Sequence, residues 1–221
     1  MRYAVIVGGG TGTRMATEIP KQFLKIGRKP IILRTIERFY EFDSNMNVIL
    51  VLPSQHITLW EHIKIEFGFS KHVTVVEGGK TRYDSVKAGL SVIHQVGVVG
   101  VHDGVRPFVS VDCLKRCYEE AEVNGNAVPV MPIEETIREV SESSNTWVDR
   151  ANYRIVQTPQ CFELLQMKKG YLGPVQPEFT DDASVMEKAG CKINLVQGNK
   201  ENIKITTPED MALAEYLTLK Q

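Results

Sequence analysis

Short apolar runs alternate with longer segments of helical period along most of this chain. The runs are continuous and rich in β-branched residues, which predicts strands covered on both faces; they lie at 3–7, 48–52, 73–76, 98–102 and 127–131. Between them, apolar residues recur every three or four positions, which predicts helices. The alternation predicts an α/β fold with a Rossmann-like, mostly parallel sheet and helices on both faces. Such a sheet binds its ligand at the carboxyl ends of its strands.

The alternation stops after Pro132. Residues 133–157 are polar, with β-propensity at Thr136-Ile137 and 146–148, and we interpret them as an antiparallel arm that leaves the core. An isolated hairpin is marginal in water, so we expect the arm to pack on a second copy of the chain as a homodimer. An arm folded back on its own domain is the alternative. Residues 1–221 are interpreted as a single domain that carries this arm.

The C-terminal part returns to a regular pattern. We expect helices at 162–170 and 181–189 and short strands at 192–196 and 203–205. A last helix begins where Thr207 can cap it, with a proline at the first helical position and Asp210 completing a capping box.

Composition excludes some classes of partner. The 26 Lys and Arg residues nearly balance the 27 Asp and Glu residues, so no global basic field would recruit nucleic acid or an anionic membrane. The apolar run at the N-terminus is too short to span a membrane, and we expect a cytoplasmic protein. The four cysteines have no histidine near them that would complete a zinc site; we interpret them as buried, reduced residues, and we expect no metal held by protein ligands.

A glycine-rich segment directly follows the first predicted strand. Its residues are Gly8, Gly9, Gly10, Thr11, Gly12, Thr13 and Arg14, and Lys21 follows. Unobstructed backbone N–H groups form an anion-binding concavity, and the two side chains add positive charge, so the segment is suited to a nucleoside triphosphate. It is not a Walker A loop, which needs the pattern G-x-x-x-x-G-K-[ST]. It is not a dinucleotide fingerprint either, because Thr13 stands in place of the third glycine.

Several motifs together resemble a known family. G-T-G-T-R-M followed by P-K is similar to the signature loop of sugar-phosphate nucleotidylyltransferases. The further motifs PKQFL, GGKTRYDS, HDGVRPF, QTPQ, TDDAS and NIKITTPED resemble the 2-C-methyl-D-erythritol 4-phosphate cytidylyltransferase family in order along nearly the whole chain. The related ribitol 5-phosphate cytidylyltransferases share most of them. The chain departs from the family pattern at Gly8-Gly9, at Thr13 and at Gly104.

The resemblance implies transfer of CMP from CTP to the phosphate of a small polyol phosphate, with release of pyrophosphate. It implies Mg²⁺ held mainly by the CTP phosphates. Catalytic roles fall on Arg14, Lys21, Arg150 and Lys204. Nucleotide binding falls on Gly8 to Thr13 and on Gly79, Arg82, Ser85 and Asp103. Binding of the polyol phosphate falls on Asp103, Gly104, Arg106, Thr136, Arg150, Thr158, Thr180 and Lys204, with Thr136 and Arg150 reaching across the dimer.

The chemistry of the reaction agrees with these residue types. A phosphate monoester has a second pKa of about 6 and is already a nucleophile at neutral pH, so positive charge and alignment are needed rather than a general base. On the residues alone, Lys204 could instead be an edge-strand lysine, Asp103 a loop cap and Arg150 a solvated charge. Three other functions stay open: a ribitol 5-phosphate cytidylyltransferase, a non-catalytic CTP sensor and a dehydrogenase. The motif HDGVRPF favours the ribitol enzymes, whereas TDDAS favours the methylerythritol enzymes.

Overall fold

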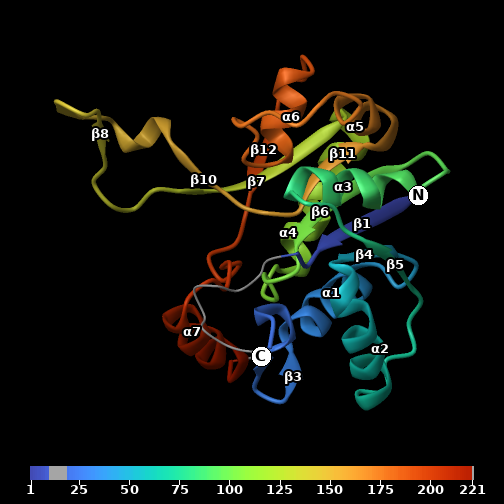
Figure 1. Ribbon diagram of the computed structural model, residues 1–221. Helices are drawn as coiled ribbons and strands as arrows, with labels where there is room; N and C mark the ends of the chain where they lie inside the picture. Colours follow the sequence, from blue (N-terminus) through green and yellow to red (C-terminus); the bar gives the residue numbers. More distant parts are fainter. Residues whose placement is uncertain (10–18, 221) are drawn as a thin grey trace.

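The computed structural model describes residues 1–9 and 19–220 (Figure 1). Its main sheet has the strand order β10-β7-β11-β6-β1-β4-β5, with β12 beside β7. Three of these strands come from the C-terminal part of the chain: β10 (Arg154–Val156), β11 (Gln160–Glu163) and β12 (Leu195–Gln197). The five strands expected from the sequence run parallel: β1 (Arg2–Val7), β4 (Asn47–Leu52), β5 (Val73–Glu77), β6 (Val98–Asp103) and β7 (Asn126–Pro132). The mostly parallel sheet predicted from the alternation is therefore confirmed.

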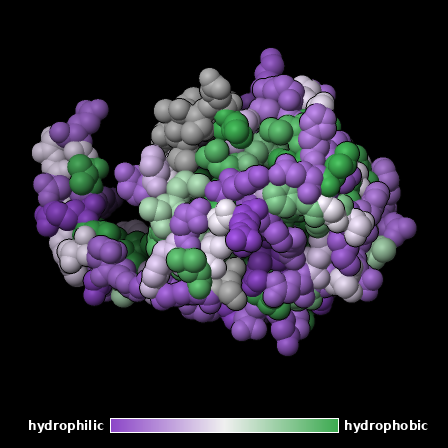
Figure 2. Space-filling view, turned by 90° about the horizontal axis from the view of Figure 1, so that it is seen from below, coloured by the Kyte–Doolittle hydropathy of each residue, from purple (hydrophilic) through white to green (hydrophobic). Residues whose placement is uncertain are grey.

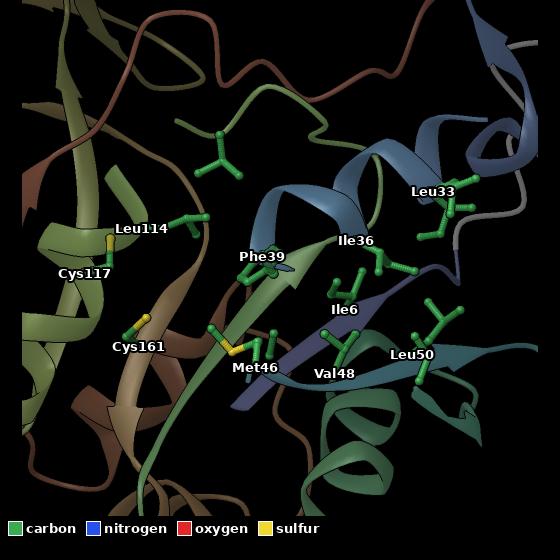
Figure 3. Close-up of a cluster of buried hydrophobic side chains, with 14 of the residues drawn as sticks. Ile6, Leu33, Ile36, Phe39, Met46, Val48, Leu50, Leu114, Cys117 and Cys161 are labelled. Atoms are coloured by element: carbon green, nitrogen blue, oxygen red, sulfur yellow. The ribbon is translucent and has the colours of Figure 1, made fainter. Parts of the chain in front are cut away.

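Helices cover both faces of this sheet, as expected. Successive residues of a strand point to opposite faces, so Ala4 and Ile6 of β1 pack on one face and Tyr3 and Val5 on the other. The first face is covered by α1 (Ile31–Phe42), α2 (Ile57–Glu66) and α4 (Val111–Asn124), and the second by α3 (Arg82–Ser91), α5 (Leu164–Gly170) and α6 (Asp182–Lys188). Figure 3 shows the first of these cores, with α1 side chains directed at β1 and β4.

One predicted secondary-structure element begins later than expected, and one is wrong. The segment from 162 begins as a strand, β11 (Gln160–Glu163), inserted antiparallel between β6 and β7, and α5 starts only at Leu164. Cys161 and Phe162 are both buried, on opposite faces of the sheet, as successive residues of a strand are. In the sequence this pattern was obscured, because the apolar residues here are also spaced as in a helix with the leucines that follow. The segment 203–205 is not a strand, although its alternation was interpreted correctly: Ile203 and Ile205 face an apolar cluster while Lys204 is exposed.

The remaining predicted boundaries shift by a few residues. The strand expected at 192–196 is β12 (Leu195–Gln197). The last helix is α7 (Pro208–Thr218), and its capping box is confirmed, since the Asp210 N–H donates to the Thr207 hydroxyl. Cys113, Cys117 and Cys161 are buried and all four cysteines are free, as expected. Two short strands, β2 (Lys25–Ile26) and β3 (Lys29–Pro30), precede α1.

The polar segment after β7 forms an arm that stands away from the body in Figures 1 and 2. Its hairpin consists of β8 (Arg138–Val140) and β9 (Asn145–Trp147), so Thr136-Ile137 lies before the strand rather than in it. The arm returns through β10 (Arg154–Val156), which pairs with β7. Apolar side chains on it are exposed: Val140 (75%), Trp147 (62%) and Ile155 (51%). The structure holds one copy of the chain, so dimerisation through the arm stays a prediction.

Candidate active site

Two adjoining hollows lie at the carboxyl ends of the parallel strands. The first, of about 320 Å³, is bordered by the segments that follow β1, β5 and β6. The second, of about 180 Å³, extends towards β11 and the start of α6. They share three lining residues, Arg82, Asp103 and Lys204. Because β1 neighbours both β4 and β6, the chain reverses its progression across the sheet beside β1, which is where such sheets bind ligands.

The first hollow contains the described part of the glycine-rich segment. A Cβ on Gly8 would lie 2.8 Å from the Leu52 side chain, so the end of β1 can approach β4 only without one. The Gly8 carbonyl accepts a hydrogen bond of 2.7 Å from the Gln22 side chain, and Lys21 lines the same hollow. The residues predicted to continue this site, Gly10, Thr11, Gly12, Thr13 and Arg14, lie outside the described residues.

The turn from β5 into α3 forms the opposite wall. Thr81 caps α3 through a capping box with Asp84, and a Cβ on Gly79 would lie 2.2 Å from the Asp84 Cβ, so only glycine fits there. The buried Ser85 hydroxyl donates to the Thr81 carbonyl at 2.9 Å. Since its hydrogen is used in that bond, this hydroxyl is left to accept a hydrogen bond from a ligand.

Asp103 ends β6 and lies among three positive charges. Its Oδ2 is 3.0 Å from Arg106 Nε and 3.1 Å from Lys204 Nζ, and its Oδ1 is 3.9 Å from Arg82 Nε. Burial alone would raise the pKa of this carboxyl, but the charges of Lys204, Arg82 and Arg106 outweigh it and hold the pKa well below its usual range. The carboxylate is therefore ionised at neutral pH and gathers the three cations at the border of the two hollows.

A network of buried amides holds the segment that carries Lys204. The Asn202 side chain donates to the Thr158 carbonyl at 2.8 Å, and the Asn202 carbonyl accepts from Arg106 at 2.8 Å. Gln157 donates to the Asn199 carbonyl at 2.9 Å. Asn202 and Gln157 are buried, so this half-exposed lysine projects from a fixed backbone. Sequence reasoning missed both amides, because a polar residue in a loop motif does not reveal whether it faces a ligand or the backbone.

His102 is committed to the fold, and Thr158 lines the second hollow while its hydroxyl bonds to His102 and to the backbone of Asp103. The Thr158 hydroxyl accepts from the Asp103 N–H at 3.2 Å and lies 3.0 Å from His102 Nδ1, while Nε2 lies 3.1 Å from the Arg106 carbonyl. The carbonyl can only accept, so Nε2 carries the proton and Nδ1 accepts from Thr158. His102 thus has the structural role favoured by a reaction without a general base.

We expect His102 to make the free energy of unfolding depend on pH. Burial lowers the pKa of His102 from 6.5 to about 4. Between those values the unfolded chain binds a proton that the folded chain does not, so stability is lost as the pH falls through this window, by about 3 kcal/mol in total. Urea unfolding at pH 7, 6, 5 and 4 measures this, with His102→Gln as the matched variant that cannot titrate. Equal slopes in the two proteins would contradict the assignment.

The other predicted site residues lie in three places: in the second hollow, in the packed body of the fold and on the arm. Thr180 lines the second hollow. Gly104 is structural: a Cβ there would lie 2.6 Å from the Ile32 side chain. Thr136 and Arg150 are exposed on the arm, and neither lines the two hollows of its own chain; Arg150 donates to the Glu134 carbonyl within the arm. Their expected action on a neighbouring subunit therefore stays a prediction.

We asked whether the side chains that line the two hollows could hold a metal ion. In the described ranges, 1–9 and 19–220, no group of three His, Cys, Asp or Glu side chains is arranged to hold one. The carboxylate at the centre, Asp103, is already bonded to Arg106 and Lys204. These residues do not fit a protein-held cation, and no step below is assigned to one. Within the same ranges no helix has the length and apolarity needed to cross a membrane.

The sheet is mostly parallel, and positively charged side chains converge where its strand order reverses. These features are typical of the α/β proteins that bind a nucleotide or another phosphate at the carboxyl edge of the sheet. The chain matches, over residues 3–220, the family model described as 2-C-methyl-D-erythritol 4-phosphate cytidylyltransferase (IspD). It therefore belongs to this cytidylyltransferase family, a group of nucleotidyltransferases.

Sequence comparison with individual proteins supports this assignment. The chain is 49% identical over 216 residues to the 2-C-methyl-D-erythritol 4-phosphate cytidylyltransferase of Bacteroides fragilis, covering 98% of this chain and 99% of that protein. It is 47% identical to the protein of the same name from Phocaeicola vulgatus, over 98% and 99% of the two chains.

Solved structures agree as well. The crystal structure of the Thermus thermophilus enzyme of that name superposes with a TM-score of 0.77 at 29% identity, covering 99% of this chain and all of the other. The 4-diphosphocytidyl-2C-methyl-D-erythritol synthase of Anaerococcus prevotii gives a TM-score of 0.85 over 100% of this chain and 96% of that one; at 24% identity, that likeness supports the fold alone.

Proposed function

We propose that this enzyme transfers CMP from CTP to 2-C-methyl-D-erythritol 4-phosphate, giving 4-diphosphocytidyl-2-C-methyl-D-erythritol and pyrophosphate in non-mevalonate isoprenoid synthesis. Family membership and relatives of the same name at 49% and 47% identity support the reaction. The observation in the structure that carries it is the border between the two hollows, where Arg82, Arg106 and Lys204 converge on Asp103.

That border suits an in-line displacement between two phosphates. CTP in the first hollow and the acceptor phosphate in the second would both bring negative charge to the residues that the hollows share. The acceptor oxygen forms a bond to the α-phosphorus of CTP while the bond from that phosphorus to pyrophosphate breaks. Positive charge fixed in advance at this point stabilises the transition state and requires no proton transfer.

The wall formed by α3 favours cytosine over uracil. Cytosine presents an amino group, a hydrogen-bond donor, where uracil presents a carbonyl acceptor. The Ser85 hydroxyl, whose hydrogen is bonded to the Thr81 carbonyl, can accept from that amino group. We assign nucleotide binding to Gly8, Gly9, Gly79 and Ser85 on this basis, together with the segment from Gly10 to Arg14.

Three further features belong to the proposal. Mg²⁺ would arrive with the triphosphate, since the described side chains offer no cage for it. The enzyme would be a cytoplasmic homodimer, with the arm of each subunit bringing Thr136 and Arg150 to its partner's second hollow. The apolar side chains exposed on the arm, among them Val140 and Trp147, support such a contact.

Pyrophosphate release tests the proposed function. The assay contains CTP and Mg²⁺ with methylerythritol 4-phosphate, ribitol 5-phosphate or no acceptor, and UTP replaces CTP in a parallel series. We expect turnover with the methylerythritol compound and CTP. Turnover with ribitol phosphate alone would keep the chemistry and change the substrate; CTP binding without turnover on either acceptor would favour a CTP sensor and contradict the proposal.

A further inference from the structure

Arg82 and Asp182 form an ion pair behind the cleft. From the first turn of α3, Arg82 donates through Nη1 to Asp182 Oδ1 at 3.0 Å and through Nη2 to Oδ2 at 2.6 Å. The Asp182 side chain is fully buried, and the Tyr171 hydroxyl donates to its Oδ1 at 2.6 Å. Burial would lower the pKa of Arg82, but the paired carboxylate outweighs it and raises that pKa. The guanidinium therefore stays charged, and two parallel hydrogen bonds join it to Asp182.

Asp182 stands on a fixed part of the fold. It is the first residue of α6, whose start is capped by Asp181 and Ser184. The Gln160 side chain, on β11, accepts from the Ala183 N–H at 2.7 Å and donates to Asp181 at 2.8 Å. Since β11 is hydrogen-bonded to β6 and β7, the carboxylate is tied to the central sheet and cannot follow a moving arginine.

Of the two residues in the pair, Arg82 lines the two hollows and Asp182 does not. Arg82 is partly exposed and is one of the three residues that line both hollows, and its Nε lies 3.9 Å from Asp103. Burying two charges costs solvation, and an apolar pair of similar size is often equally stable, so stability alone gives little reason for this arrangement. Pairing with Asp182 also compensates the charge of Arg82 beside Arg106 and Lys204, while three of its five N–H groups remain for other partners.

We propose that Asp182 is a positioning residue, which holds the Arg82 guanidinium at the border of the two hollows so that it can donate hydrogen bonds to the phosphate oxygens that meet there. Asp182 itself touches neither substrate. The inference rests on the proposed CMP transfer and deepens it: Arg82 acts on the reacting phosphates and not on the nucleotide base alone. Its contribution should therefore fall on kcat more than on the affinity for CTP.

The test compares variants in steady-state kinetics with CTP and methylerythritol 4-phosphate, alongside the Kd for CTP and the Tm. Asp182→Asn keeps the shape but faces Arg82 with an amide, and we expect kcat to fall about tenfold or more, since ångström-scale misplacement can cost up to 100-fold. The Kd for CTP should change less than threefold. Arg82→Met should lower kcat at least as much, and Asp182→Asn should add nothing in that background, because it acts through Arg82.

Two variants separate this role from a structural one. Arg82→Met with Asp182→Leu replaces the pair by apolar groups; it should keep a Tm near that of the wild type and still lose kcat. Tyr83→Phe removes a neighbouring hydrogen bond to the Gly173 carbonyl and should leave kcat unchanged. Wild-type kcat in Asp182→Asn or in the apolar double variant would overturn the inference while the proposed function stands. An inactive wild-type enzyme would overturn both.

Discussion

Replacing Lys204 by alanine is expected to lower kcat by roughly 100-fold, or about 3 kcal/mol of transition-state stabilisation, the amount that one preorganised donor at a developing charge contributes. Lys204 is the lysine that lines both hollows, and its Nζ lies 3.1 Å from Asp103. An arriving phosphate offers it a second anionic partner. Steady-state kinetics with saturating CTP measure the loss.

Lys200→Ala is the matched control. Lys200 lies four residues away on the same segment, is exposed and pairs with Glu134 rather than with Asp103. Its removal should change kcat less than threefold, because an exposed ion pair is worth little. Asp103 keeps Arg106 in the Lys204→Ala variant, so the Tm should hold. Equal losses in the two variants, or no loss in Lys204→Ala, would contradict the role given to Lys204.

Arg150→Ala is expected to be as inactive as Lys204→Ala when each variant is assayed alone, and a mixture of the two should regain activity. If Arg150 serves the partner's site, a mixed dimer contains one site with both wild-type residues and one with neither. Random exchange of subunits makes half of the dimers mixed, so an equimolar mixture should recover roughly a quarter of wild-type activity.

Several observations motivate this experiment. The arm projects from the body (Figure 2). Arg150 lies on it, is exposed, and bonds to the Glu134 carbonyl of the same arm. Subunits are mixed under conditions that allow exchange and are assayed over time, with Arg150→Ala mixed with itself as the control. A mixture that stays inactive although mass spectrometry shows mixed dimers would contradict a site shared between subunits.

The sequence predicted what depends on local periodicity. Buried strands such as 98–102 were recognised because a strand covered on both faces is apolar throughout. Asp103 was placed correctly because the end of a parallel strand is where such a sheet binds its ligand, and its surroundings now show why a carboxylate suits that position. Thr207 and Asp210 likewise fix the start of α7 through purely local bonds.

Contacts between residues that are far apart in the sequence could not be predicted from it. β11 was missed because Phe162 is spaced helically with the leucines that follow it, and the pairing with β6 and β7 that makes the segment a strand is not local. The bond between Arg82 and Asp182 spans 100 residues, and each side chain alone is an ordinary residue at the start of a helix. The bonds of the Thr158 hydroxyl to His102 and to the Asp103 N–H are likewise visible only in three dimensions, and its contact with the polyol phosphate stays a prediction.

The proposed reaction requires that the acceptor phosphate attacks the α-phosphorus of CTP. Phosphorus-31 NMR of a single reaction with CTP, Mg²⁺ and methylerythritol 4-phosphate tests it directly. We predict that the signals of CTP and of the phosphate monoester disappear together, while one pyrophosphate and two coupled signals of a diphosphate diester appear. Release of CMP and pyrophosphate with the monoester unchanged, or an unchanged spectrum, would contradict the claim.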